Sequence, residues 1–179
     1  SGTGIPPRAL DRVIGVTKAY GTRVGAGPFP TEDFGKEGER LREIGREFGT
    51  TTGRPRRCGW IDAVALRYSV RSNGIDGLAV VKPDVLRGFK SLKMCVAYDT
   101  PQGRINHVPA TAPGLFAAKP IYREFPGFEE DISGVRTMSA LPANARKFVE
   151  AISQEAGAPV TLVSVGPSRE QVILPDAAA

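Results

Sequence analysis

The sequence has little of the residue types that build disulfide frameworks and metal sites. Its 179 residues include two cysteines, Cys58 and Cys95, and one histidine, His107. Two cysteines form no disulfide framework, and no Cys/His spacing suits zinc, so we expect no metal site and a reducing, cytoplasmic location. Cys58 follows Arg57, but no base is near it in the sequence, which favours a packed thiol. His107 lies in a Gly/Asn/Pro-rich loop and is expected to be exposed.

Long apolar runs and glycine-rich phosphate loops are also absent from the sequence. No apolar run approaches the roughly 20 residues that span a bilayer, and no basic-then-apolar leader opens the chain. We therefore expect no membrane association and no secretory signal. Neither G-x-x-x-x-G-K-[ST] nor G-x-G-x-x-G occurs, which excludes the usual phosphate cradles from these residues.

Strong charge of one sign is missing as well. The 24 Lys and Arg residues exceed the 19 Asp and Glu residues by only five, and acidic residues interrupt the basic ones almost everywhere. With aromatic residues at 7%, the chain also lacks the mixed basic and aromatic surface that binds nucleic-acid bases. We expect no nucleic-acid partner, although the mild positive charge is compatible with small anionic ligands.

The apolar patterns alternate between strand and helix. They predict helices over residues 35–48, 61–73 and 142–157, strands over residues 77–81, 91–98 and 159–165, and shorter extended pieces at residues 22–24, 120–124 and 171–174. Residues 9–20 have near-helical apolar spacing, so no strand is expected before residue 22, and Thr31 is expected to cap the first long helix. The alternation indicates an α/β fold. Because such a fold usually starts with a strand and its phosphate turn, we expect an N-terminal part to be missing.

One loop concentrates hydrogen-bond donors. It comprises Thr50, Thr51, Thr52, Gly53, Arg54, Pro55, Arg56 and Arg57. Gly53 and Pro55 exclude a helix, while the hydroxyls and guanidiniums can donate to carboxylate or phosphate oxygens. The pattern predicts a loop that closes around a doubly anionic small molecule. The alternative is an ordinary basic turn.

Two further motifs follow predicted strands: Lys82-Pro83-Asp84 and Ser164-Val165-Gly166-Pro167. A carboxylate can accept hydrogen bonds from both N1–H and the exocyclic amine of guanine, whereas adenine does not present these donors. The stem of Lys82 can lie along a base, and the second motif offers Ser and Gly groups to a base carbonyl. Lys-x-Asp alone is a weak signal for guanine binding. The alternative is that Lys82 and Asp84 form an ordinary ion pair at the end of the strand. Two such motifs beside an anion-type loop favour a nucleotide site.

The chain resembles the adenylosuccinate synthetase family over essentially its whole length. The resemblance is carried mainly by residues 22–32 and 47–60, with Gly4–Arg8, Lys18–Tyr20, Asp62, Val85-Leu86, Ser164 and Gly166-Pro167. The family joins IMP to L-aspartate at the expense of GTP and yields adenylosuccinate, GDP and phosphate. GTP phosphorylates the purine O6, the amine of aspartate displaces that phosphate, and Mg²⁺ bridges the phosphates. The resemblance therefore implies a GTP-dependent C–N ligase of AMP biosynthesis, usually a homodimer.

The resemblance also implies roles for particular residues. Aspartate and IMP would contact Val24, Thr50, Thr51, Thr52, Gly53, Arg54, Pro55 and Arg56. GTP would contact Arg56, Lys82, Pro83, Asp84, Ser164, Val165 and Gly166. Within these sets, Thr50 and Thr52 would hold the carboxylates of aspartate, Arg54 would also touch the IMP ribose, and Val24 would pack on that ribose. Arg56 would lie near the GTP phosphates.

Two departures from the family limit these expectations. Pro83 replaces an apolar residue, usually Leu, and is expected to bias Lys82 toward an extended backbone. The chain also matches only the C-terminal part of the family. Residues 1–174 are expected to form the C-terminal portion of one domain, a GTP-binding-type α/β fold with a mostly parallel central sheet that is incomplete here, and residues 175–179 a tail.

Catalytic residues and Mg²⁺ ligands are accordingly expected upstream and none in this chain. The segment alone is predicted to be inactive. Two alternatives remain open: a non-catalytic module that binds a purine nucleotide or a dicarboxylate, and a basic nucleic-acid-binding domain, which the dispersed charge disfavours.

Overall fold

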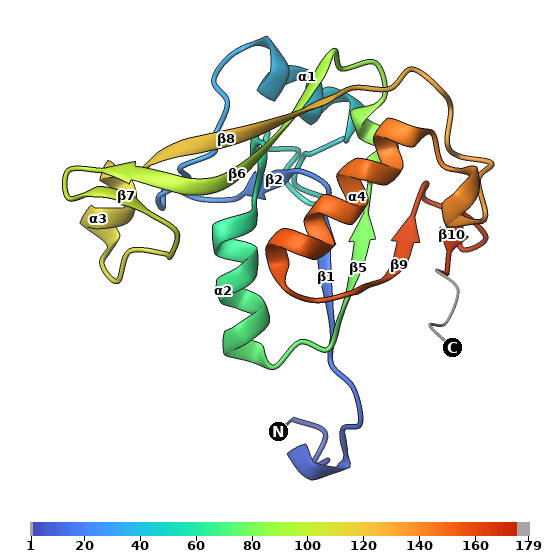
Figure 1. Cartoon of the computed structure of the whole chain (residues 1–179), viewed down its shortest axis with the longest axis horizontal. Coiled ribbons are helices and arrows are strands. Elements are labelled where there is room, and N and C mark those ends of the chain that lie inside the picture. Colours follow the sequence, from blue (N-terminus) through green and yellow to red (C-terminus); the bar gives the residue numbers. More distant parts are fainter. Residues whose placement is uncertain (1, 175–179) are drawn as a thin grey trace.

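A computed structural model describes residues 2–174; the tail predicted at residues 175–179 lies outside the described residues. Its main sheet has the order β1-β5-β9-β10 (Figure 1). These strands are β1 (Ile14–Lys18), β5 (Gly77–Val81), β9 (Val160–Ser164) and β10 (Val172–Ile173). The β1–β5 and β5–β9 pairs are parallel, and β10 is antiparallel to β9. The carboxyl ends of β5 and β9 therefore meet at one edge of the sheet.

A second sheet is built around one long strand, β6 (Ser91–Thr100). Its other strands are β4 (Ile61–Asp62), β7 (Gly103–Ile105) and β8 (Lys119–Pro126). The pairing of β6 is parallel with β4 and antiparallel with β7 and β8. In Figure 1 the β6–β8 ribbon reaches away from the main sheet and carries β7 and the short helix α3 (Ala112–Ala117) at its far end. A third, two-stranded sheet pairs β2 (Gly21–Arg23) with β3 (Arg57–Gly59).

Three longer helices are α1 (Lys36–Ile44), α2 (Ala63–Asn73) and α4 (Ala143–Ala156). Short 3-10 turns cover Pro7–Ala9, Pro83–Leu86 and Met138–Ala140. Asp62 caps the N-terminus of α2, because its Oδ1 accepts a hydrogen bond from the Ala65 backbone N–H at 3.0 Å. The helix ends at Gly74 in the left-handed conformation, as predicted from Asn73-Gly74. α4 confirms the clearest sequence prediction, because its apolar stripe, including Phe148 and Ile152, is buried.

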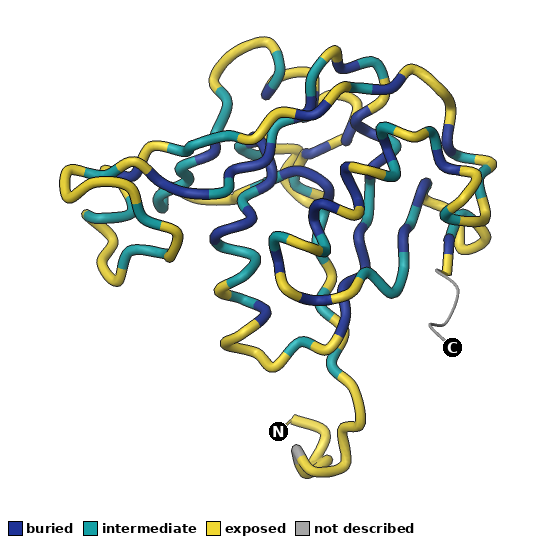
Figure 2. The backbone as a smooth tube through the Cα atoms, in the orientation of Figure 1, coloured by how far each residue is buried: buried dark blue, intermediate teal, exposed yellow. Residues whose placement is uncertain are grey.

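One hydrophobic core joins the helices to both larger sheets. Phe148 of α4 meets Phe125 of β8 edge to face, with ring centroids 5.3 Å apart, and Trp60 meets Phe89 in the same manner at 5.6 Å. Aliphatic side chains make up most of the rest of the core, as the low aromatic content predicts. Figure 2 shows buried stretches along β5, β6 and α4, and an exposed segment before β1.

The prediction for residues 9–20 is wrong. Ile14–Lys18 form strand β1, which pairs with β5 in the register Val16↔Ala79. Val13, Ile14, Val16 and Thr17 are β-branched and favour extended backbone, and the ladder to β5 outweighs their helix-like spacing.

The N-terminus of α1 also differs from the prediction. Its N-cap is Gly35, and Asp33 Oδ1 accepts hydrogen bonds from the backbone N–H groups of Gly35 at 2.8 Å and Gly38 at 3.2 Å. Thr31, the predicted cap, is buried instead. Asp33 takes over because its carboxylate lies within reach of these two N–H groups.

Candidate functional site

The carboxyl ends of β5 and β9 bring two of the predicted motifs together. Val81 is paired with Ser164, and the backbone N–H of Lys82 donates to Ser164 O at 3.2 Å. Beside this contact lies a cavity of about 620 Å³, which we call the strand-end cavity. It is lined by Ile44, Gly45, Arg46, Val81, Lys82, Asp84, Val85, Ser164, Gly166 and Pro167. Four residues predicted for guanine therefore line one cavity, whereas Pro83 and Val165 are buried and do not line it.

Among the described residues, Asp84 is the one acidic residue that lines this cavity. Its Oδ1 is buried and has no hydrogen-bond partner among residues 2–174. Burial raises the pKa of the Asp84 carboxyl, and this effect outweighs its own backbone N–H and the nearby charge of Lys82. A buried carboxylate oxygen without a donor is costly, and a ligand N–H would remove that cost.

Lys82 adopts a different backbone conformation from the predicted one. Its φ of 63° and ψ of 33° lie in the left-handed region, not in the extended region. Pro83 begins a 3-10 turn, and a residue before proline avoids the right-handed helical region, which leaves the left-handed region as the compact choice. In this conformation the Nζ of Lys82 donates to Gly45 O at 2.7 Å and to Glu47 Oε1 at 2.8 Å. In the described part of the chain Lys82 is ion-paired with Glu47, not with Asp84.

The Thr50–Arg57 loop is closed at its base by backbone hydrogen bonds. Gly49 N–H donates to Arg54 O, and Gly53 N–H donates to Gly49 O, both at 2.8 Å. Gly53 has φ of 64°, which favours glycine. A small cavity of about 110 Å³, the loop cavity, lies against it and is lined by Arg23, Val24, Gly25, Gly49, Thr52, Arg54, Pro55, Arg56 and Arg57. Five predicted residues line it, while Thr50, Thr51 and Gly53 are exposed outside its lining.

The three guanidiniums of this loop differ in their surroundings. Arg57 donates to both carboxylate oxygens of Glu32 and to the carbonyls of Gly25 at 2.9 Å and Gly27 at 2.7 Å, which anchors the turn beside Val24. Its donors are therefore used within the protein. Arg54 is exposed, and Arg56, whose Nη1 binds Glu47, is half-buried and lines the loop cavity. Arg54 and Arg56 are thus the guanidiniums that can serve a ligand.

Glu47 is a residue of this region to which sequence reasoning assigned no role. It is fully buried, and its Oε1 accepts hydrogen bonds from Lys18 Nζ at 2.8 Å, Lys82 Nζ at 2.8 Å and Tyr20 OH at 2.6 Å. Its Oε2 accepts a hydrogen bond from Arg56 Nη1 at 2.8 Å. Burial alone would raise the pKa of Glu47, but these four donors outweigh it and lower the pKa to about 2. Only its place at the start of the 47–60 block marked it in the sequence.

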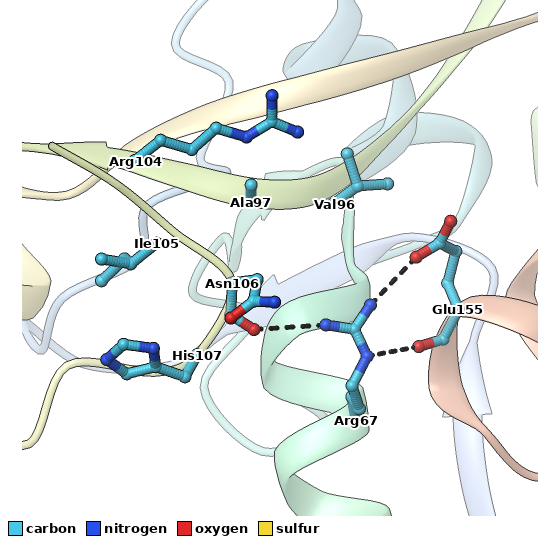
Figure 3. Close-up of a pocket in the computed structure, with 8 residues that line it drawn as sticks. All are labelled: Arg67, Val96, Ala97, Arg104, Ile105, Asn106, His107 and Glu155. Carbon is cyan, nitrogen blue, oxygen red and sulfur yellow. Dashed lines mark hydrogen bonds and ion pairs between the residues drawn. The ribbon is translucent and has the colours of Figure 1, made fainter.

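A third cavity, of about 740 Å³, lies away from all predicted site residues (Figure 3). It is lined by Arg67, Val96, Ala97, Arg104, Ile105, Asn106, His107 and Glu155. Figure 3 shows the Arg67 guanidinium between two elements, where Nε and Nη2 bind Glu155 and Nη1 donates to Asn106 O at 3.2 Å. Arg67 therefore holds the fold together here. His107 is exposed, as predicted.

The two cysteines are packed thiols, as predicted for Cys58. Cys58 and Cys95 are buried and free, and burial is the main cause that raises the pKa of each thiol. Across residues 2–174, no group of three or more His, Cys, Asp or Glu side chains is arranged to hold a metal ion. Within the same residues no helix has the length and apolar character needed to cross a membrane.

A mostly parallel sheet with a polar cavity at its strand ends places the chain among α/β proteins, which commonly bind ligands at that edge. The family model for adenylosuccinate synthetase matches residues 1–173. The chain therefore belongs to the adenylosuccinate synthetase family, whose members are ligases of purine biosynthesis.

Individual relatives support the same assignment. The adenylosuccinate synthetases of Acidothermus cellulolyticus and Lactobacillus acidophilus are 52% and 53% identical to the chain over 174 residues, which is 97% of this chain and 41% of each relative. A solved structure described as the fully ligated adenylosuccinate synthetase from Plasmodium falciparum matches with a TM-score of 0.92 and 40% identity, over 97% of this chain and 42% of that one. The chain spans about 40% of the length of the curated relatives it matches.

Proposed function

We propose that this chain is the C-terminal part of a full-length adenylosuccinate synthetase that joins IMP to L-aspartate with GTP. In this proposal the strand-end cavity binds the guanine of GTP, and the loop cavity binds the carboxylates of aspartate. Asp84 carries the proposal, because it lines a cavity large enough for a purine base and its buried Oδ1 has no hydrogen-bond partner among residues 2–174. Guanine supplies two N–H donors that a carboxylate can accept, and adenine does not.

The loop supports the aspartate assignment by the chemistry of its donors. Thr52, Arg54 and Arg56 line the loop cavity, and a guanidinium can bind a carboxylate with two parallel hydrogen bonds. Arg56 also bonds Glu47, which in turn holds Lys82 of the strand-end cavity. The proposed aspartate and guanine sites are therefore joined by one chain of hydrogen bonds.

The described residues bind and orient substrates in this proposal and perform no proton transfer. Lys18, Arg56 and Lys82 all pair with the single carboxylate of Glu47. This cluster therefore carries a net positive charge, which attracts phosphate and carboxylate groups. Mg²⁺ would neutralise phosphate charge in the complete enzyme, and no step is assigned to it here. Homodimer formation and a cytoplasmic location complete the proposal.

The test is the substitution Asp84→Asn in the full-length protein. An amide turns an N–H₂ group or a weaker acceptor toward the N–H donors of guanine, so the KM for GTP is expected to rise about 10- to 100-fold. The KM for IMP is expected to stay within about twofold. Asp99→Asn, at an exposed carboxylate of β6, is the matched control. Equal loss of GTP and IMP binding would contradict the guanine assignment.

A further inference from the structure

Glu47 lies between the two cavities in the sequence as well as in space. The residues before it, Ile44, Gly45 and Arg46, line the strand-end cavity. Several residues after it, Gly49, Thr52 and Arg54 to Arg57, line the loop cavity. Both walls therefore extend from the single segment that Glu47 anchors.

Each carboxylate oxygen of Glu47 holds a residue of a different cavity. Oε1 binds Lys82 Nζ of the strand-end cavity, and Oε2 binds Arg56 Nη1 of the loop cavity, both at 2.8 Å. The backbone adds to this link, because Arg56 N–H donates to Glu47 O at 2.9 Å. A shift of Glu47 would consequently move both residues.

Backbone strain is concentrated at the same place. Within residues 2–174, Arg46 with φ of 50° and Lys82 with φ of 63° are the non-glycine residues in the left-handed region. Arg46 directly precedes Glu47, and Lys82 is ion-paired with it. Such strain persists where surrounding bonds hold the backbone, and it is common at ligand sites. One strained residue therefore adjoins Glu47 in the sequence, and the other binds its carboxylate.

From these observations we infer that Glu47 is a positioning residue that couples the guanine site to the aspartate site; this inference rests on the proposed function. Glu47 holds Lys82 and Arg56 at a set separation by binding both with its two oxygens. Without its charge, Lys18, Lys82 and Arg56 repel one another and both cavities change shape. The residue thus acts on two substrates without touching either.

The test compares Glu47→Gln with the wild type in the full-length enzyme. Glutamine keeps the size of the side chain but loses its charge and one acceptor oxygen, so at least one link is lost. We expect the KM values for GTP and for aspartate each to rise tenfold or more, with the KM for IMP within about twofold. Glu155→Gln is the control, because Glu155 is also ion-paired to an arginine but lies at the cavity of Figure 3.

The outcomes separate positioning from a purely structural role. A structural role predicts a lower melting temperature and a lower kcat with both KM values unchanged, and this result would overturn the inference. A rise of one KM alone would overturn the coupling as well. If Glu47→Gln does not fold, Glu47→Asp is measured instead, because it keeps the charge but is too short to hold Lys82 and Arg56 together. The same rise in both KM values is then expected.

Failure of the inference differs from failure of the proposed function. If Asp84→Asn weakens GTP selectively while Glu47→Gln leaves both KM values unchanged, the guanine site stands and the coupling is wrong. If Asp84→Asn leaves GTP unaffected, the guanine assignment itself fails.

Discussion

Lys82 Nζ lies 2.8 Å from Glu47 Oε1, although the two residues are 35 positions apart in the sequence. The same ammonium donates to Gly45 O at 2.7 Å. The charge of Lys82 is therefore used within the protein, and its stem is the part left to pack against a base in the strand-end cavity.

The affinity for GTP is expected to fall as the pH falls. Burial raises the pKa of Asp84, and guanine N–H donors favour the ionised carboxylate, so GTP binding must release any proton that Asp84 carries. Isothermal titration of the full-length protein in two buffers of different ionisation enthalpy measures this release. Asp84→Asn should abolish it, and an identical release in that variant would assign the proton to another group.

Arg54→Leu in the full-length protein is expected to raise the KM for aspartate about 10- to 100-fold, because a guanidinium–carboxylate pair is lost. Steady-state kinetics at saturating GTP and IMP measures the effect. Arg71→Leu, at an exposed arginine in the last turn of α2, is the matched control and should leave that KM unchanged. An unchanged KM in Arg54→Leu as well would support the basic-turn interpretation of the loop.

Glu47 should make the protein sensitive to acid. Its pKa falls from an ordinary value of 4.5 to about 2 in the fold, so its ionisation stabilises the folded state above pH 4.5 and this contribution is lost as the pH falls toward 2. The contribution is on the order of 3 kcal/mol. Urea unfolding at a series of pH values should show the stability difference between wild type and Glu47→Gln shrinking over this interval. A difference that is constant with pH would disprove the assignment.

Asp62 is expected to be a strong stability determinant. Its Oδ1 caps α2, and its Oδ2 accepts a hydrogen bond from Tyr98 OH at 2.6 Å. Asp62→Ala removes the cap and leaves a buried hydroxyl without its acceptor, which should cost about 2–4 kcal/mol. Tyr98→Phe keeps the cap and should cost about 1–2 kcal/mol. Chemical denaturation measures both, and equal costs would mean that the cap contributes nothing.

Residues 1–179 alone are expected to show no turnover with IMP, aspartate and GTP. Phosphoryl transfer depends on charges positioned around the transferring group, and this chain spans only about 40% of the length of the curated relatives it matches. A phosphate-release assay at high protein concentration is the measurement. Turnover above the background of a mock purification would contradict the assignment of catalysis to the rest of the enzyme.

Local sequence patterns predict several helices and strands correctly. The apolar spacing of Ala145, Phe148, Val149 and Ile152 predicts α4, and the apolar run Gly77–Val81 predicts β5. Both patterns are local, since each lies within a short segment of the sequence. β1 was missed because its helix-like spacing gives no information about the β5 ladder that it joins. Thr31 was assigned as a cap although Asp33, two residues later, reaches the backbone N–H groups.

By itself, the sequence determined the family, the main helices and strands, and the residue types at each strand end, because these are local properties of the chain. Only the tertiary structure decided that Lys18, Arg56 and Lys82 meet on the carboxylate of Glu47. The reason is that ion pairing depends on distance in space and on burial. Residues 29 and 35 positions from Glu47 carry no sequence signal that they will lie within 3 Å of it.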